Sequence, residues 1–379
     1  MRRRRRLAPI DLVALMNMGL GRVVVVGGGF AALEVALALR KLDASVPVTV
    51  VSDETEVVYR PWLIRVPAGG QQPPIIPFAR LLEAAGVEVV ARRVAGADLD
   101  QRHLVLDSGA AIDYEQLVVA TGATADRQRV PGALRHAIFT CDLDDAAALE
   151  ARISAGASHL AVVFGWERHG PGLEYAAWIA RHRSGVRVTA VDGDGTMARR
   201  FGDKAMAWIR TRLERLGAHL ITDGTVERIG EGTVHLSEGA VDADLIAIVA
   251  PLRGNAAWLP PNLLTDYGML RVDNTMAAGP GVFAIGDVVA VPDGYRLPPA
   301  LRSIQATAPG VARNVAGALR GATMQPVLEL GRPDMLAPDL AGVSVLVRDR
   351  RLVLRGRLPL LIRASGERRY LRSRSARGS

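Results

Sequence analysis

A glycine run lies between a predicted strand and a predicted helix near the start of the chain. The run, Gly27-Gly28-Gly29-Phe30-Ala31-Ala32, fits the pattern G-x-G-x-x-A. In such a pattern Gly27 permits a tight turn, Gly29 lets the backbone approach a pyrophosphate, and Ala32 allows close packing of helix on strand. Free N–H groups and the dipole at the helix N-terminus favour the anion. The sequence therefore predicts a dinucleotide-binding loop, rather than a glycine turn with a packing role alone.

The end of the next strand is expected to carry an acid that binds a ribose of the same dinucleotide, about 20 residues after the glycines. Ser52 holds that position and Asp53 follows it. We expect Asp53 to reach the ribose 2′-hydroxyl, or Ser52 to bond it directly. The alternative for Asp53 is a solvated acid in a turn.

Two further motifs follow in the order of a known family. Residues 113–123 contain Ala120-Thr121-Gly122, and residues 282–287 end in Gly286-Asp287. Together with the glycine run, they resemble the FAD-dependent pyridine nucleotide-disulfide oxidoreductase superfamily. The resemblance implies FAD as cofactor, held by residues 27–32 and 120–122, with Asp287 bonded to the ribityl chain. A dehydrogenase that uses only a nicotinamide would not explain the pair Gly286-Asp287.

Within that superfamily, residues 58–69 resemble a stretch of the type II NADH dehydrogenase and sulfide:quinone oxidoreductase branch that lies beside the flavin ring. The resemblance assigns Arg60, Pro61 and Val94 to the FAD site. The disulfide-reductase branch carries a cysteine pair in its first flavin helix, whereas Cys141 is the only cysteine of this chain. Dithiol chemistry within one chain is therefore excluded, and we expect Cys141 to be structural.

A second strand–loop–helix unit begins its loop at Gly165, which corresponds in position to Gly27. An NAD(P)H site would repeat the glycine pattern, but the chain reads Gly165-Trp-Glu-Arg-His-Gly-Pro-Gly-Leu-Glu174. Part of this stretch resembles sulfide:quinone and flavocytochrome c sulfide dehydrogenases, which do not use NADH. Asp192 ends the next strand and is a candidate ribose ligand, or a plain turn residue. We assign Gly165, Glu174 and Asp192 to an NAD(P)H site, with a different donor as the open alternative.

Other polar and aromatic residues receive no catalytic assignment. Trp166 and Glu167 either face the flavin or form a packing tryptophan beside a solvated acid. His136 and His169 are the histidines nearest to the candidate loops, and a loop histidine is more often a surface residue than a proton donor. The seven histidines show no metal-ligand spacing, so no metal site is expected.

The elements that must position these motifs alternate between strand and helix. Four consecutive valines before the glycine run predict a buried parallel strand. The repeated order predicts an α/β fold with two Rossmann-like dinucleotide-binding domains. Its strands are expected at 22–26, 46–51, 160–164 and 186–191, and its helices at 30–41 and 172–181.

Several other segments have a predicted conformation. Prolines exclude regular structure from residues 70–77. Short strands at 87–91, 104–106 and 117–120 predict a meander. A helix is expected at 306–319 with Pro309 in its first turn, and residues 303–310 lie where type II NADH dehydrogenases carry a quinone motif. We divide the chain into a disordered extension (1–19), an FAD-binding domain (20–130 and 265–322), a second dinucleotide-binding domain (131–264) and a C-terminal segment with a basic tail (323–379).

The net charge of +8 would by itself favour a nucleic-acid partner. The positive charge is at the ends, because residues 2–6 are all arginine and residues 350–379 hold ten arginines and one glutamate. The two ends together carry more positive charge than the whole chain, so the residues between them are acidic overall. No nucleic-acid partner is therefore expected. The tail predicts contact with an anionic membrane surface, or else a disordered soluble tail. No apolar run could span a membrane, so we expect a cytoplasmic protein, free or peripheral on the cytoplasmic face, with a homodimer left open.

Together the motifs predict an FAD-dependent oxidoreductase that takes a hydride from NAD(P)H and passes electrons to a quinone or another small acceptor. One alternative keeps FAD and takes electrons from a donor such as a sulfur compound. The other is a non-catalytic flavin-binding regulatory protein, and the degenerate second glycine loop is the feature in its favour.

Overall fold

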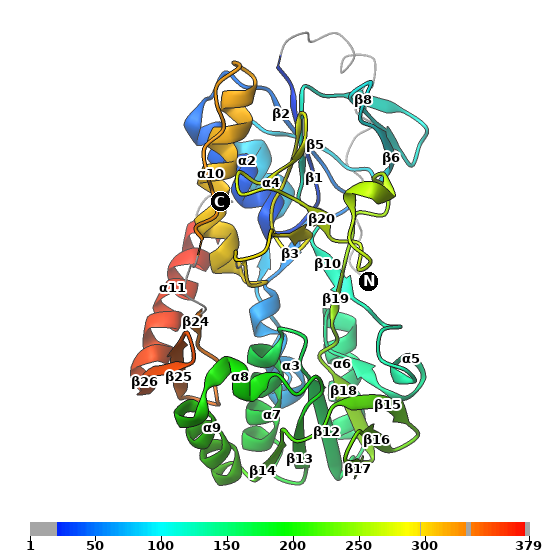
Figure 1. Cartoon of the computed structure of the whole chain (residues 1–379), viewed down its shortest axis with the longest axis vertical. Helices are drawn as coiled ribbons and strands as arrows, with labels where there is room; N and C mark the ends of the chain where they lie inside the picture. The colour runs from blue at the N-terminus through cyan, green and yellow to red at the C-terminus, as the bar shows by residue number, and fades with distance from the viewer. Residues whose placement is uncertain (1–20, 296, 331–334, 376–379) are drawn as a thin grey trace.

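The computed structural model describes residues 21–295, 297–330 and 335–375. The chain forms two α/β units that follow one another along the long axis of the molecule (Figure 1). The expected extension at 1–19 lies outside the described residues. Within the described ranges, no helix is long and apolar enough to cross a membrane.

The first unit is built on a six-stranded sheet. All its neighbouring strands are parallel except the pair β21 and β22. Helix α2 (Phe30–Leu42) connects β1 to β2 and buries an apolar face on the sheet, and helix α10 (Leu301–Ala318) packs beside α2. In the order β21-β22-β9-β1-β2-β5, the strands are Ala277–Gly279, Val282–Ala284, Gln116–Val119, Val23–Val26, Val48–Val51 and Glu88–Val90.

The second unit repeats this arrangement on a five-stranded parallel sheet. Helices α6 (Leu143–Ser154), α7 (His169–His182) and α9 (Asp203–Arg215) pack on it. The predicted α/β fold with two Rossmann-like units is confirmed. In the order β11-β18-β12-β13-β14, the strands are Ile138–Phe139, Leu245–Ile248, His159–Phe164, Arg187–Asp192 and Ala218–Ile221.

Smaller elements extend the two units. Each unit carries a three-stranded antiparallel sheet, β6-β7-β8 in the first and β15-β16-β17 in the second, and the pair β10–β19 lies between the units. Their bounds are Val94–Asp98, His103–Leu106, Ala111–Asp113, Val226–Gly230, Thr233–Leu236, Gly239–Asp242, Ala123–Ala125 and Leu252–Gly254. The remaining short elements are α4 (Phe78–Ala84), α5 (Ala133–His136), α8 (Met197–Phe201), η2 (Pro261–Leu263), β20 (Leu270–Arg271) and β23 (Val289–Ala290).

Three local predictions are wrong. The expected meander is not formed by its three strands, because β5 and β9 belong to the parallel sheet and only β7 lies in a meander. Residues 70–77 include a short strand, β4 (Ile75–Ile76), which pairs with β3 (Val57–Val58) because the prolines stand on either side of it. Helix α10 begins at Leu301, so Pro309 is inside the helix. Pro309 lies on an exposed face, where a carbonyl that lacks an N–H partner can be solvated.

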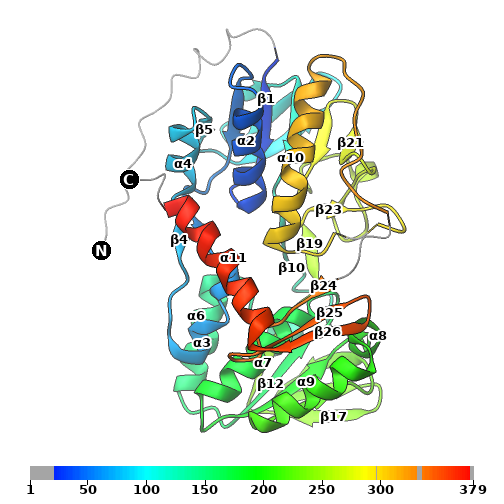
Figure 2. The same ribbon diagram turned by 90° about the vertical axis from the view of Figure 1, so that its left-hand side faces the viewer.

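The last part of the chain forms what we call the C-terminal arm, residues 335–375. Its strands β24 (Met335–Leu336), β25 (Ser344–Arg348) and β26 (Arg351–Gly356) make a small sheet whose inner face joins the core of the second unit. Helix α11 (Arg357–Ser375) then runs back to the first unit (Figure 2). A disordered tail is therefore the wrong alternative for residues 357–375.

A short excursion runs in the opposite direction. Between β3 and β4 the chain leaves the first unit and forms η1 (Arg60–Trp62) and α3 (Arg65–Gly69). Helix α3 packs against helices α6 and α7 of the second unit. Leu63 and Val66 pack there against Ala146. The Arg65 guanidinium lies 3.9 Å from the centre of the Trp62 ring and 5.0 Å from that of Trp178.

Candidate functional site

The three predicted flavin motifs meet at the carboxyl ends of adjacent strands β1, β9 and β22. Gly27 has φ +136°, and a Cβ there would lie 2.3 Å from the Ala120 carbonyl oxygen. Gly286 has φ +87°, and its Cβ would lie 2.7 Å from the Cβ of Ala31. Only glycine fits either place, and this edge of a parallel sheet is where ligands bind in such folds.

The end of β2 adjoins the same loop. A Cβ on Gly28 would lie 2.2 Å from Ser52 Oγ, so the buried Ser52 touches the glycine run directly. No atom lies within 4 Å of the Cβ position at Gly29, which leaves the backbone of that residue open to a ligand. Phe30 begins α2 immediately afterwards, and the helix N-terminus therefore faces the open position.

The predicted ribose acid lies further out. Asp53 is exposed and accepts hydrogen bonds from Arg93, at 2.5 Å from Nη2 and 3.0 Å from Nε. Val94 follows Arg93 and is buried in the first core. Of the two strand-end candidates, Ser52 is the one in contact with the glycine run, and the ribose role of Asp53 stays a prediction.

The Asp287 carboxylate lies half-buried next to Gly286. Burial raises the pKa of Asp287, while the charges of Arg168 and Arg60 lower it. No hydrogen bond to this carboxylate comes from the residues that the structure describes. The hydroxyl of Thr121, in the second flavin motif, is also buried without a partner. Two polar groups at the strand ends thus have no partner among the described residues, and they lie where FAD is expected.

An aromatic cluster supports the glycine loop from behind. Phe30 meets Tyr59 edge-on at 5.9 Å between ring centres, and Tyr370 of the C-terminal arm at 6.1 Å. The Tyr370 hydroxyl donates a 3.0 Å hydrogen bond to Glu34, and Arg374 pairs with the same carboxylate at 2.6 Å. The arm therefore contacts the first turns of α2, which sequence reasoning missed.

The loop of the second unit has a different character. Gly165 has φ +147° and occupies the same place after β12 as Gly27 after β1. Trp166 and Glu167 follow with φ +49° and +68°, in the left-handed region that favours glycine. Trp166 N–H donates a 2.5 Å hydrogen bond to Asp194, and the Trp166 ring lies over Gly193, where a Cβ would be 2.8 Å from Cη2.

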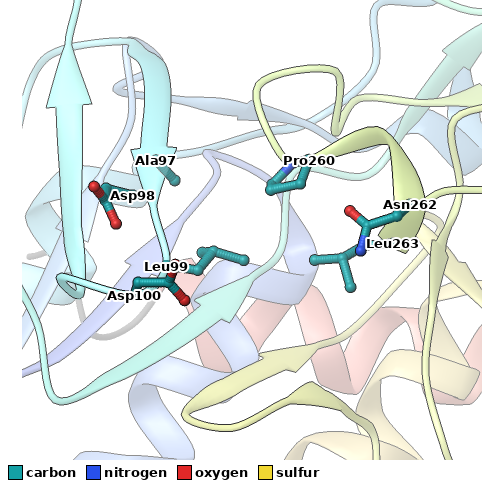
Figure 3. Close-up of a pocket in the computed structure, with 7 residues that line it drawn as sticks. All are labelled: Ala97, Asp98, Leu99, Asp100, Pro260, Asn262 and Leu263. Carbon is teal, nitrogen blue, oxygen red and sulfur yellow. The ribbon is translucent and has the colours of Figure 1, made fainter.

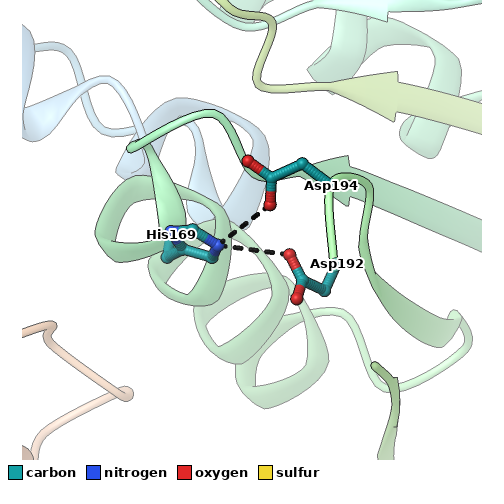
Figure 4. Close-up of side chains that lie close together, drawn as sticks. All are labelled: His169, Asp192 and Asp194. Atoms are coloured by element: carbon teal, nitrogen blue, oxygen red, sulfur yellow. Dashed lines mark hydrogen bonds and ion pairs between the residues drawn. The ribbon is translucent and has the colours of Figure 1, made fainter. Parts of the chain in front are cut away.

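Behind this loop lies a group that we call the His169 cluster: His169, Asp192 and Asp194 (Figure 4). His169 Nε2 lies 3.2 Å from Asp192 Oδ1 and 3.5 Å from Asp194 Oδ1. Burial lowers the pKa of His169, but both carboxylates raise it by more, so the net shift is upward. Burial raises the pKa of Asp194, but hydrogen bonds from His169, Thr196 and Trp166 lower it by more, so the net shift is downward.

The carboxylate oxygens of this cluster have donors in the protein. Asp192 Oδ2 accepts the Met197 N–H at 2.8 Å, and Asp194 Oδ1 accepts the Thr196 hydroxyl at 2.8 Å. Each oxygen is thus satisfied without a metal ion. His169 received no role from the sequence, although its place in the first turn after the loop, facing a strand-end acid, was a signal.

The predicted residue Glu174 has other partners. It is buried on α7 and contacts Arg363 of the C-terminal arm, with a second contact of 3.3 Å between Oε2 and Nη2. Its Oε1 also accepts the Asp339 N–H at 2.9 Å. Glu174 therefore holds the arm, and its assignment to an NAD(P)H site remains a prediction without a contact that supports it.

Cys141 and Arg168 lie together beside the second loop. The half-buried Cys141 follows β11, and its Sγ lies 3.6 Å from Arg168 Nη1. Arg60 is exposed on η1 next to Pro61, and His136 is half-buried at the end of α5, away from the strand ends.

A surface hollow lies elsewhere, between the turn after β6 and η2 (Figure 3). No residue of the three flavin motifs lines it, so it is not part of the candidate site. Its lining residues are Ala97, Asp98, Leu99, Asp100, Pro260, Asn262 and Leu263.

Comparisons with known proteins agree with this geometry. The family model described as pyridine nucleotide-disulphide oxidoreductase matches residues 21–312. The ferredoxin–NAD(+) reductase component of a biphenyl dioxygenase system from Paraburkholderia xenovorans is 31% identical over 283 residues, 71% of this chain and 68% of the relative. The flavoprotein chain of a flavocytochrome c sulfide dehydrogenase from Chlorobaculum thiosulfatiphilum is 52% identical over 44 residues, 12% of this chain and 92% of the relative.

A solved structure shows the same fold. The sulfide:quinone oxidoreductase from Aquifex aeolicus superposes with a TM-score of 0.80 at 18% identity, over 94% of this chain and 92% of that chain. The family match over residues 21–312 and the relative at 31% identity show that the chain belongs to the pyridine nucleotide-disulphide oxidoreductase family, and membership of this family implies FAD and NAD(P)H.

Proposed function

We propose that the chain is an FAD-dependent oxidoreductase that holds the flavin at the first loop and passes its electrons to a quinone or another small acceptor. The observation that carries this proposal is the Asp287 carboxylate, which burial takes partly out of water and which no described residue hydrogen-bonds. A buried carboxylate is costly unless it is bonded. The ribityl hydroxyls of FAD are suitable donors.

The residues of the first loop fit FAD. Gly27 and Gly29 would admit the pyrophosphate to the N-terminus of α2. Ser52, which touches Gly28, would bond a ribose hydroxyl, and Asp287 would bond the ribityl chain. When bound, the flavin accepts two electrons from one partner and releases them to another, and the protein positions it and tunes its surroundings. Arg60 brings a positive charge to that region, since it acts on the Asp287 carboxylate.

Absorption of the purified protein tests this proposal. Bands near ~450 nm are expected for a bound flavin. Asp287→Ala removes a charged acceptor whose hydrogen bond is worth ~1.5–3 kcal/mol, so FAD affinity should fall roughly 10- to 100-fold. Asp266→Ala, at an exposed position of the same unit, is the matched control. Purified protein without flavin bands that also fails to take up added FAD would refute the proposal.

The donor has two candidates. NAD(P)H is supported by the family match and by the relative named as an NAD(+) reductase component. A sulfur compound is supported by the short stretch shared with a sulfide dehydrogenase flavoprotein. Slow reduction by every donor, with FAD tightly held, would instead favour a regulatory flavoprotein.

The acceptor is proposed as a quinone or another small molecule. The stretch 303–310 lies within α10, where Ser303, Thr307 and Gly310 are buried and Gln305 is exposed. The relative that is named as a ferredoxin reductase component favours a ferredoxin-type protein as a second candidate. Turnover with a soluble quinone analogue against turnover with a ferredoxin separates the two acceptors.

Contact with a membrane surface is a further part of the proposal. On α11, Leu358, Leu361 and Ile362 are 55%, 57% and 62% exposed, and the exposed Arg368 and Arg369 follow toward the end of the helix. An apolar patch beside basic residues suits an anionic bilayer surface. Flotation with anionic liposomes should retain the protein, and Leu361→Glu/Ile362→Glu should abolish that retention while flavin binding stays intact.

A further inference from the structure

The second loop stands where NAD(P)H would bind, yet its residues do not fit a dinucleotide. In the first loop, no atom lies within 4 Å of the Cβ position at Gly29. Counted from the end of the strand, as Gly29 is the third residue after β1, the third residue after β12 is Glu167, which is exposed and has φ +68°. The second loop is one residue longer, and Arg168 stands between Glu167 and α7. A carboxylate at the point where a backbone must approach a pyrophosphate adds both bulk and like charge.

The candidate ribose ligand Asp192 is also occupied. It is the last residue of β13, at the register position that Val51 has on β2, and its side chain is only 1% exposed. One of its oxygens faces His169 Nε2 and the other accepts the Met197 N–H. A ribose hydroxyl would have to break one of these buried contacts, because neither oxygen has free surface.

The turn after β13 is covered by an aromatic ring. The Trp166 ring lies over Gly193, and the backbone N–H of Trp166 donates a hydrogen bond to Asp194 of the His169 cluster. At the first loop, the matching turn is formed by Ser52 and Asp53, whose side chains leave Gly29 open. Trp166 therefore fills the space between loop and turn where the adenosine part of a dinucleotide would cross.

The charge at this end of α7 is mixed. Glu167 and Asp194 bring negative charge, the buried Asp192 pairs with His169, and Arg168 at the N-cap of the helix brings a positive charge. Of the three acids only Glu167 is an exposed residue, so its carboxylate is the one that a pyrophosphate would meet.

From these contacts we infer that the second loop is closed to NAD(P)H by Trp166, Glu167 and the His169 cluster, and that the flavin is reduced by a small donor without a dinucleotide. The inference rests on the proposed FAD function and specifies the donor class of the same site. The loop of the second unit is then held shut by its own side chains.

The first test uses FAD-loaded protein under anaerobic conditions. Dithionite should bleach the flavin bands, whereas NADH and NADPH at ~1 mM should leave them unchanged, and equilibrium dialysis should detect no NADH binding tighter than ~1 mM. Bleaching by NADH or NADPH within seconds, or an NADH Kd in the micromolar range, would overturn the inference while leaving the FAD proposal intact. Absence of flavin, by contrast, would remove the FAD proposal itself.

The second test opens the loop. Trp166→Gly/Glu167→Gly places glycine at two positions with positive φ, clears the ring and removes the charge. NADH affinity should rise at least tenfold over the wild type by the same dialysis, which is a readout independent of turnover. Glu231→Gln removes an acid from an exposed turn of the same unit and should leave NADH affinity unchanged. An opened variant that keeps its flavin and its far-ultraviolet circular dichroism, but gains no NADH affinity, counts against the closed-loop reasoning.

Discussion

The C-terminal arm is held on the second unit by a largely buried ion pair whose removal has a calculable cost. The Glu174 side chain is 8% exposed and that of Arg363 is 26% exposed. The Glu174 carboxylate contacts both terminal nitrogens of Arg363 and also accepts the Asp339 N–H. Arg363 also donates hydrogen bonds to the Glu367 carboxylate, at 3.0 Å, and to the carbonyl of Ala337, at 3.1 Å.

These partners make the two truncations unequal. Arg363→Met leaves the Glu174 carboxylate buried and unpaired, and we expect a loss of ~3–5 kcal/mol in unfolding free energy. Glu174→Gln keeps an oxygen for the Asp339 N–H and leaves Arg363 with Glu367, so we expect only ~1–2 kcal/mol. The double variant removes both charges of the pair, and its stability should return to within ~1–2 kcal/mol of the wild type.

Urea unfolding of the four proteins, followed by tryptophan fluorescence and by circular dichroism, measures the cycle. Arg355→Met, at an exposed position on β26 of the same arm, is the control and should change stability by less than ~0.5 kcal/mol. A cost below ~1 kcal/mol for Arg363→Met, or a double variant as unstable as that single variant, would show that Glu174 is not buried under the arm.

Three further perturbations test other contacts. Because the pKa of His169 is raised above 6.5, the stability from its ion pairs is complete below that pH and is lost as pH rises through the folded-state pKa. Urea unfolding at pH 6 and pH 9 should show this loss, and His169→Gln should show less of it. Gly286→Val drives a Cβ to 2.7 Å from Ala31 at a positive φ, so it should lower both FAD content and Tm, whereas Gly342→Val at an open position should lower Tm alone. Arg374→Gln breaks the ion pair with Glu34 at α2 and should speed FAD release several-fold in a stopped-flow displacement, and equal release rates would refute a link between the arm and the glycine loop.

The elements that carry the flavin motifs could be predicted because their signals are local. Four valines followed by Gly27 specify a buried strand and a tight turn within a few residues, and 282–287 likewise hold a strand end and Asp287. The strands β5 and β9 were misplaced in a meander, since three or four residues carry too little pattern to distinguish a parallel neighbour from an antiparallel one.

The rest of the site depends on contacts between distant residues. His169 and Asp192 are 23 positions apart, and Arg363 and Glu174 are 189 apart. Nothing near Glu174 in the sequence indicates that an arginine from the end of the chain will cover it. Its carboxylate could therefore be recognised as polar and placed on the correct helix, but not matched to its partner.

The excursion through η1 and α3 has a consequence for how the molecule can move and be divided. It places side chains of the first half, such as Leu63 and Val66, in the packing of the second half. The C-terminal arm does the reverse, because Tyr370 crosses from the second half to the aromatic cluster at Phe30. This reciprocal exchange fastens the halves at two separate places, so a hinge rotation during turnover would have to break both. A cut between the halves would leave apolar surface bare on each side, so we expect neither half to fold by itself.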